Sequence, residues 1–202
     1  MVSLAKANGV ILISDEIHSD LIFNGRKHIP AASLSPEAAG YVITCISATK
    51  TFNMAGLQAS TTVFPTVEMK VRFDRFWRNL EIHRNNAFSL IAMETAYREG
   101  EEWLEELKVY LRDNFQFVHD YCAQHIPAIK AHIPDATYLM WLDCRDLGME
   151  QEALVKFMIE KAGLGLSNGK GFAPSLAGYM RLNAACPRAT LEKAMGQLEA
   201  AV

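Results

Sequence analysis

The first third of the chain contains apolar runs that are nearly continuous rather than alternating. Two of them are GVILIS at 9–14 and YVITCIS at 41–47. Such runs are typical of parallel strands that are covered on both faces of a sheet. A third run, LQASTTVF at 57–64, also has strand character. Together these segments predict a partial, mostly parallel sheet.

After Pro65 the pattern changes to a helical period. PTVEMKVRFDRFWRNLEI and NNAFSLIAMETAYREG both show this period, which predicts two amphipathic helices. A longer segment at about 100–126 repeats apolar residues three or four positions apart and gathers acidic residues in its first turn, where the helix dipole favours them. We expect one long helix there.

The last third alternates between strand and helix signals. TYLMWLD at 137–143 and GYMRLNAA at 178–185 predict strands, and EQEALVKFMIEKAG predicts a helix that ends at a glycine. A closing helix follows Pro187, because proline is favoured near a helix start. The whole pattern predicts an α/β fold with a sheet-bearing N-terminal part, a long connecting helix and a small C-terminal α/β part.

Composition and charge narrow the classes of function. The chain has 202 residues, of which 50% are hydrophobic, so it can bury a substantial core. Its net charge of −3, with mixed signs, gives no argument for a nucleic-acid partner or an acidic membrane surface. No apolar run approaches the ~18 residues of a membrane-spanning helix, and the N-terminal segment lacks the features of a secretory signal. Four separated cysteines without a C-x-x-C pair indicate free thiols in a reducing cytoplasm.

Asp15 and Lys50 stand at the ends of the first two predicted strands. Since open α/β sheets bind ligands at the carboxyl ends of their strands, both residues are expected at the ligand-binding edge. They could form a buried ion pair. Alternatively, they could hold pyridoxal 5'-phosphate, whose aldehyde condenses with a lysine and whose ring nitrogen pairs with an aspartate. These two residues alone leave both interpretations open.

Arg181 adds a third chemical group, within YMRLNAACPR. An arginine on a strand presents a rigid fork that can grip a carboxylate at two points. Taken alone, it would be interpreted as a surface arginine on an edge strand.

The segment DEIHSD combines three acidic residues with a histidine and could suggest a metal cluster. At a strand end, however, successive side chains point to different faces. We therefore expect no metal site there.

Six segments occur in an order and spacing that resemble the fold-type-I pyridoxal-phosphate enzymes. They are SDEIHSDLIFNG, SATKTFNMAGLQAS, HRNNAFSLIAMETAY, GEEWLEEL, ATYLMWLDCR and GYMRLNAACPR. More narrowly, they resemble the aminotransferase-like C–S lyases, the cystathionine β-lyases of the maltose-regulon modulator type. The resemblance implies that residues 1–105 are the C-terminal part of a large cofactor-binding domain and that 106–202 form a small C-terminal α/β domain. The long helix at about 100–126 would link the two.

The resemblance also implies roles for individual residues. Lys50 would be the lysine that forms a Schiff base with pyridoxal 5'-phosphate, and Asp15 would pair with the ring nitrogen. Ser47 matches a position whose hydroxyl contacts the cofactor phosphate. Arg181 matches the arginine that binds the substrate α-carboxylate.

Two positions favour a lyase over an aminotransferase. His18 falls where aspartate-type aminotransferases carry a tyrosine that touches the ring hydroxyl, and a histidine there is typical of the lyase branch. Gln58 replaces an arginine that grips the phosphate in those aminotransferases. The implied enzyme is a homodimeric C–S β-lyase that cleaves a cysteine thioether to a thiol, pyruvate and ammonia. An aminotransferase is the alternative.

Members of this family are much longer than this chain. Their glycine-containing phosphate turn, the aromatic residue that stacks on the ring and an Asn-Pro motif are all expected upstream of the position of Asp15. The chain could therefore be a piece of such an enzyme, or an inactive fragment that serves only as a folding or interaction module.

Overall fold

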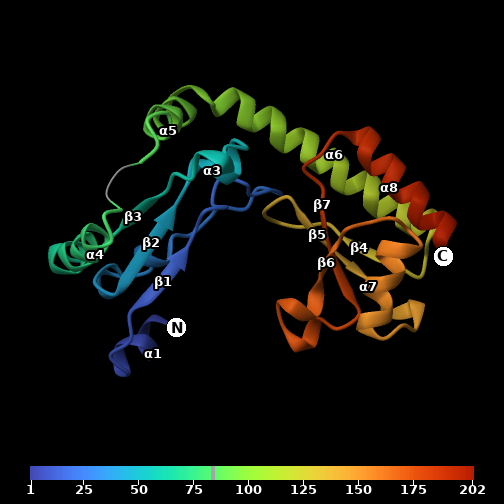
Figure 1. Cartoon of the computed structure of the whole chain (residues 1–202), viewed down its shortest axis with the longest axis horizontal. Helices are drawn as coiled ribbons and strands as arrows, with labels where there is room; N and C mark the ends of the chain where they lie inside the picture. Colours follow the sequence, from blue (N-terminus) through green and yellow to red (C-terminus); the bar gives the residue numbers. More distant parts are fainter. Residues whose placement is uncertain (83–84) are drawn as a thin grey trace. The chain divides into compact units, whose positions relative to one another are not determined.

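The computed structural model describes residues 1–82 and 85–202. The chain forms two compact units, Met1–Glu105 and Glu106–Val202 (Figure 1). His83 and Arg84, which open the HRNNAFSLIAMETAY segment, lie outside the described residues. Among the helices of the described residues, none is long and apolar enough to cross a membrane.

The first unit contains a three-stranded sheet. Its strands are β1 (Leu12–Asp15), β2 (Val42–Ile46) and β3 (Thr61–Val63), in the order β1-β2-β3. β1 and β2 run parallel, as their apolar runs predict, whereas β3 pairs antiparallel with β2. The segment between β2 and β3 includes Asn53 and Gln58, both with a positive φ, and the chain reverses its direction across it.

The described residues of the first unit include helices that are mostly short. They are α1 (Val2–Ala7), α2 (Pro36–Ala39), α3 (Ala48–Thr51), α4 (Val67–Asn79) and α5 (Ser89–Glu99), with 3-10 turns η1 (Ala31–Ser33) and η2 (Ala55–Leu57). α4 and α5 confirm the two helices predicted after Pro65. The core of this unit is small, and α4 contains no buried residue. Its buried apolar side chains include Leu21, Phe23, Ala38, Val42, Ala48 and Ala59.

The second unit is built on a four-stranded antiparallel sheet. Its strands are β4 (Lys130–His132), β5 (Leu139–Asp143), β6 (Ser167–Asn168) and β7 (Tyr179–Asn183), in the order β4-β5-β7-β6. β5 and β7 confirm the two predicted strands, and β7 lies in the interior of the sheet rather than at its edge. β4 and β6 were not predicted, because runs of three and two residues carry no measurable period.

Three α-helices accompany this sheet: α6 (Glu101–His125), α7 (Gln151–Glu160) and α8 (Arg188–Ala201), with 3-10 turns η3 (Arg145–Leu147), η4 (Gly169–Gly171) and η5 (Pro174–Leu176). α6 is the predicted long helix, and its residues Leu111, Phe115, Val118 and Cys122 are fully buried. α8 adds Leu191, Met195 and Leu198 to the buried set. This apolar core makes the second unit the better packed of the two.

All four cysteines are free thiols. Burial raises the pKa of Cys122 to about 11, and burial together with the nearby Asp143 charge raises that of Cys144 to about 12. These two thiols therefore stay protonated at neutral pH and act as small apolar core residues.

Candidate active site

The carboxyl ends of β1 and β2 bring the two predicted site segments to one edge of the first sheet. Asp15 is the last residue of β1 and pairs with Cys45 across the parallel ladder. α3 begins at Ala48, three residues beyond Cys45, and Lys50 is its third residue. Asp15 is exposed and Lys50 is half-buried. Both residues therefore occupy the sheet edge at which the sequence placed them.

Lys50 and Asp15 do not form the ion pair that the sequence left open. Within residues 1–82 and 85–202, the structure shows no hydrogen bond or salt bridge between these two side chains. The Asp15 carboxylate accepts a hydrogen bond from the backbone N–H of Ile17, at 3.3 Å. An amine and a carboxylate therefore stand at one sheet edge without neutralising each other.

Ser47 holds the turn that carries Lys50. It is buried, and its hydroxyl oxygen accepts a hydrogen bond from the Thr49 N–H at 3.0 Å, which caps α3. The same hydroxyl donates to the carbonyl of Ala59 at 2.6 Å, in the segment that leads into β3. A phosphate contact from this hydroxyl would have to replace the bond to Ala59.

His18 lies in the turn that follows β1. It is half-buried, and its carbonyl accepts a hydrogen bond from the Leu21 N–H at 3.1 Å. His18 therefore lies in the loop that directly follows Asp15, at the carboxyl end of β1.

Glu16 is a buried residue of this loop, and its role in holding the loop was not predicted from the sequence. One carboxylate oxygen accepts hydrogen bonds from Ser14 Oγ and the Ala31 N–H, both at 2.9 Å, and the other lies 2.7 Å from His28 Nε2. Burial alone would raise the pKa of Glu16, but the bonds from His28, Ala31 and Ser14 outweigh it and hold the pKa below its ordinary value. Glu16 therefore anchors the loop. In the described part of the chain, no group of three histidine, cysteine or acidic residues could hold a metal ion.

Arg181 belongs to the second unit, on β7, where it pairs with Trp141 of β5 and Ser167 of β6. Its guanidinium lies over the Phe172 ring, 4.1 Å from the ring centroid, and Phe172 meets Trp141 edge-on at 5.6 Å. Its Nε is buried without a hydrogen-bond partner among the described residues, and no acidic side chain of that part of the chain pairs with it. The interior position of β7 overturns the interpretation of Arg181 as an edge-strand surface residue.

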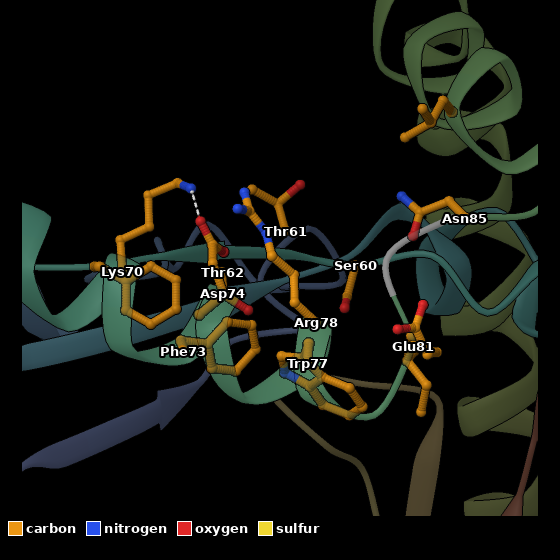
Figure 2. Close-up of a pocket in the computed structure, with 13 residues that line it drawn as sticks. Ser60, Thr61, Thr62, Lys70, Phe73, Asp74, Trp77, Arg78, Glu81 and Asn85 are labelled. Carbon is orange, nitrogen blue, oxygen red and sulfur yellow. Dashed lines mark hydrogen bonds and ion pairs between the residues drawn. The ribbon is translucent and has the colours of Figure 1, made fainter.

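A pocket of the first unit is a different feature. It has a volume of about 1040 Å³ and is lined by β3, α4 and the start of α5 (Figure 2). Its lining combines the hydroxyls of Thr61 and Thr62 with the aromatic rings of Phe73 and Trp77, and Lys70 pairs with Asp74 beside it. Neither Lys50 nor Asp15 is among its lining residues. The pocket is therefore separate from the strand ends that carry Asp15 and Lys50.

The sequence and the fold place the chain in a known family. Residues 1–198 match the family model of aminotransferase class I and II, and the chain belongs to this family.

Similar proteins refine this assignment. The chain is 39% identical over 199 residues to cystathionine beta-lyase PatB of Bacillus subtilis strain 168, which covers 98% of the chain and 51% of PatB. It is 33% identical over 202 residues to protein MalY of Escherichia coli K12, covering 98% of the chain and 50% of MalY. A PLP-bound crystal structure from Clostridium difficile 630, named as an aminotransferase, superposes with a TM-score of 0.95 at 41% identity, covering 99% of this chain and 52% of that one. The chain spans about half the length of the curated relatives it matches.

Proposed function

We propose that the protein is a pyridoxal-phosphate-dependent C–S β-lyase. With water, it would cleave a cysteine thioether to a thiol, pyruvate and ammonia. The observation that carries this proposal is the placement of Lys50 and Asp15 at the carboxyl edge of two parallel strands, unpaired with each other. The name of PatB, a cystathionine beta-lyase, supports the reaction, and the Clostridium difficile structure, which is named an aminotransferase and is PLP-bound, supports the cofactor.

The groups that this edge offers fit pyridoxal 5'-phosphate. The cofactor needs an amine for its aldehyde, a carboxylate for its ring nitrogen and donors for its phosphate. Lys50 offers the amine, and the exposed Asp15 carboxylate has further oxygen lone pairs to offer beyond the bond from the Ile17 N–H. Ser47 stands at the start of α3 and offers the hydroxyl. When bound, the cofactor would supply an electron-withdrawing ring that stabilises negative charge on the substrate Cα.

Each residue then has a distinct task. Lys50 would hold the cofactor covalently and, once released by the substrate amine, accept the proton from Cα as a general base. The negative charge of Asp15 would keep the ring nitrogen protonated. Arg181 would bind the substrate α-carboxylate, because its guanidinium is held against Phe172 and has no carboxylate partner among the described residues.

His18 and Gln58 favour elimination over transamination. By resemblance, His18 replaces the tyrosine and Gln58 the phosphate-binding arginine of aspartate-type aminotransferases. Gln58 is exposed and closes η2 in the left-handed conformation, with φ of 50°. This uncharged side chain cannot supply the positive charge that an arginine at this position would offer to a phosphate.

The decisive experiment measures product without an added acceptor. The complete enzyme, loaded with pyridoxal 5'-phosphate, should release pyruvate from cystathionine when no keto acid is present. Product that forms only after a keto acid is added would establish the aminotransferase alternative. Absence of the yellow absorbance that appears when a lysine condenses with the cofactor, in the 202-residue chain, would favour the fragment that acts only as a folding or interaction module.

We also propose that residues 1–105 correspond to part of a large cofactor-binding domain and residues 106–202 to a small C-terminal domain. The division of the chain into Met1–Glu105 and Glu106–Val202 supports this proposal. The complete enzyme would be a homodimer in the cytoplasm, and the four free cysteines of this chain support the cytoplasmic location. Sedimentation equilibrium of the complete enzyme tests the dimer.

A further inference from the structure

A hydrogen bond joins the two loop segments of the candidate site. The Thr51 hydroxyl donates to a carboxylate oxygen of Asp20 at 2.8 Å, although the two residues are 31 positions apart. Thr51 directly follows Lys50, and Asp20 stands two residues after His18. Thr51 is only 1% exposed, so water competes little for its hydroxyl.

The segment around Asp20 is itself held by consecutive turns. The Ser19 N–H donates to the Glu16 carbonyl at 2.9 Å, and the Leu21 N–H donates to the His18 carbonyl at 3.1 Å. Leu21 is fully buried, which fixes the far end of these turns. A movement of Asp20 would therefore carry His18 with it.

The turn that carries Lys50 is too short to hold its own position. α3 has four residues, and a single helical turn is unstable in isolation. On its other side, the Phe52 ring packs against Tyr97 and Trp103, with centroid distances of 6.2 and 5.5 Å. The ring fills the space beside Gly100, where an added Cβ would lie 2.4 Å from a Phe52 ring carbon. Phe52 and Thr51 thus anchor α3 at two points.

We infer that Asp20 is a positioning residue, which couples the His18 turn to the Lys50 turn through Thr51. This inference rests on the proposed function for its meaning, since it assigns Asp20 to the geometry of the cofactor site. Asp20 acts through Thr51 and needs no contact with the reacting atoms. The oxygen of Asp20 is required as a hydrogen-bond acceptor, and the hydroxyl of Thr51 as a donor.

Matched substitutions separate this bond from general packing. Asp20→Ala and Thr51→Val remove one partner each, whereas Asp20→Asn and Thr51→Ser keep an acceptor and a donor. Amide hydrogen exchange of the 202-residue chain is then compared at residues 16–21 and 48–54. The amides of β5 in the second unit serve as an internal control.

The two removing substitutions should each speed exchange about fivefold in both segments, the factor that corresponds to a net hydrogen bond of about 1 kcal/mol. The double variant should exchange no faster than either single one, because both remove the same bond. Asp20→Asn and Thr51→Ser should stay near the unmodified chain. Faster exchange confined to the substituted segment, or additive effects in the double variant, would overturn the coupling.

A second readout links the coupling to Lys50 itself. The chain is mixed with pyridoxal 5'-phosphate, reduced with borohydride, and the modified lysines are mapped by mass spectrometry, with Lys70 as the reference. Asp20→Ala and Thr51→Val should lower modification of Lys50 relative to Lys70 about fivefold. If the unmodified chain shows no preference for Lys50, the proposed function fails, while the exchange result still decides the coupling. Equal modification in all variants, with Lys50 preferred, would overturn the role of Asp20 at the cofactor site.

Discussion

Asn114 is a buried polar residue of α6 whose removal should destabilise the second unit strongly. Its side-chain amide donates to the carbonyls of Ala184 and Cys186 at 2.9 and 3.1 Å, and its oxygen accepts from Arg188 Nε at 2.9 Å. Asn114 is 0% exposed. These bonds tie α6 to the segment that leads from β7, the strand of Arg181, into α8.

The structure gives the magnitude of the loss. Asn114→Ala removes three hydrogen bonds with a net value of about 1 kcal/mol each, and it leaves the buried Ala184 carbonyl without this donor. We therefore expect the free energy of unfolding of the second unit to fall by about 3 kcal/mol. Because a small domain has a urea dependence of about 1–3 kcal/mol per molar, the midpoint should fall by about 1.5 M.

The measurement is a urea titration followed through the amide signals of β5 and β7, which report on the second unit alone. Gln116→Ala is the matched control, since Gln116 lies on the same helix, is exposed, and bonds only to Asp120 at 2.8 Å. Its midpoint should shift by less than about 0.3 M. Asn114→Asp should resemble Asn114→Ala, because a carboxylate cannot donate to the two carbonyls. If Asn114→Ala unfolds at the same urea concentration as the control, the hydrogen bonds of Asn114 do not stabilise this unit.

Three further predictions test other parts of the protein. In the complete enzyme, Lys50→Ala should lower turnover by about 10³-fold or more while the thermal midpoint stays unchanged, and substantial residual elimination would contradict the role of Lys50. Hydrogen bonds from Arg145 lower the pKa of Asp143 from 3.8 to about 2. The ionised Asp143 therefore stabilises the folded state above about pH 4, and this stabilisation should be lost as the pH falls towards 2. Asp143→Asn should remove about 1 kcal/mol of this pH dependence, and acid unfolding that is the same in the variant would refute the prediction. Ile13, Val63 and Phe76 of the first unit are 65, 52 and 60% exposed, so light scattering of the 202-residue chain should show self-association rather than a stable monomer.

Periodicity predicted the long elements of the fold because each repeats a pattern over several turns or alternations. α6 begins and ends within one residue of its expected bounds, and β5 and β7 lie inside their predicted runs. The antiparallel direction of β3 could not be predicted from the sequence, since a strand of three residues carries no signal of its direction. It depends on the path of the preceding segment, in which Asn53 and Gln58 adopt left-handed conformations.

The residues of the candidate site also include some that the sequence could predict and some that it could not. Asp15 and Lys50 were predictable because a strand end is visible in the sequence and places its next residues at the sheet edge. The bond between Thr51 and Asp20 and the bond between Glu16 and His28 span 31 and 12 positions. Side-chain bonds of this range leave no periodic trace, so residues that hold a site together remain hidden until the fold brings them into contact.

Two arginines of the second unit show why chemistry must be assigned from surroundings rather than residue type. The Arg145 guanidinium donates two hydrogen bonds to Asp143, at 2.8 and 2.7 Å, and lies 5.0 Å from the Tyr179 ring centroid. Its charge is balanced, so it has little left to offer an external carboxylate. Arg181 also lies against an aromatic ring, but no carboxylate pairs with it among the described residues, and its strand is held on both sides within the sheet. A positive charge that is fixed in position and lacks an internal partner is the property required to bind an anionic substrate, and this property distinguishes Arg181 from Arg145.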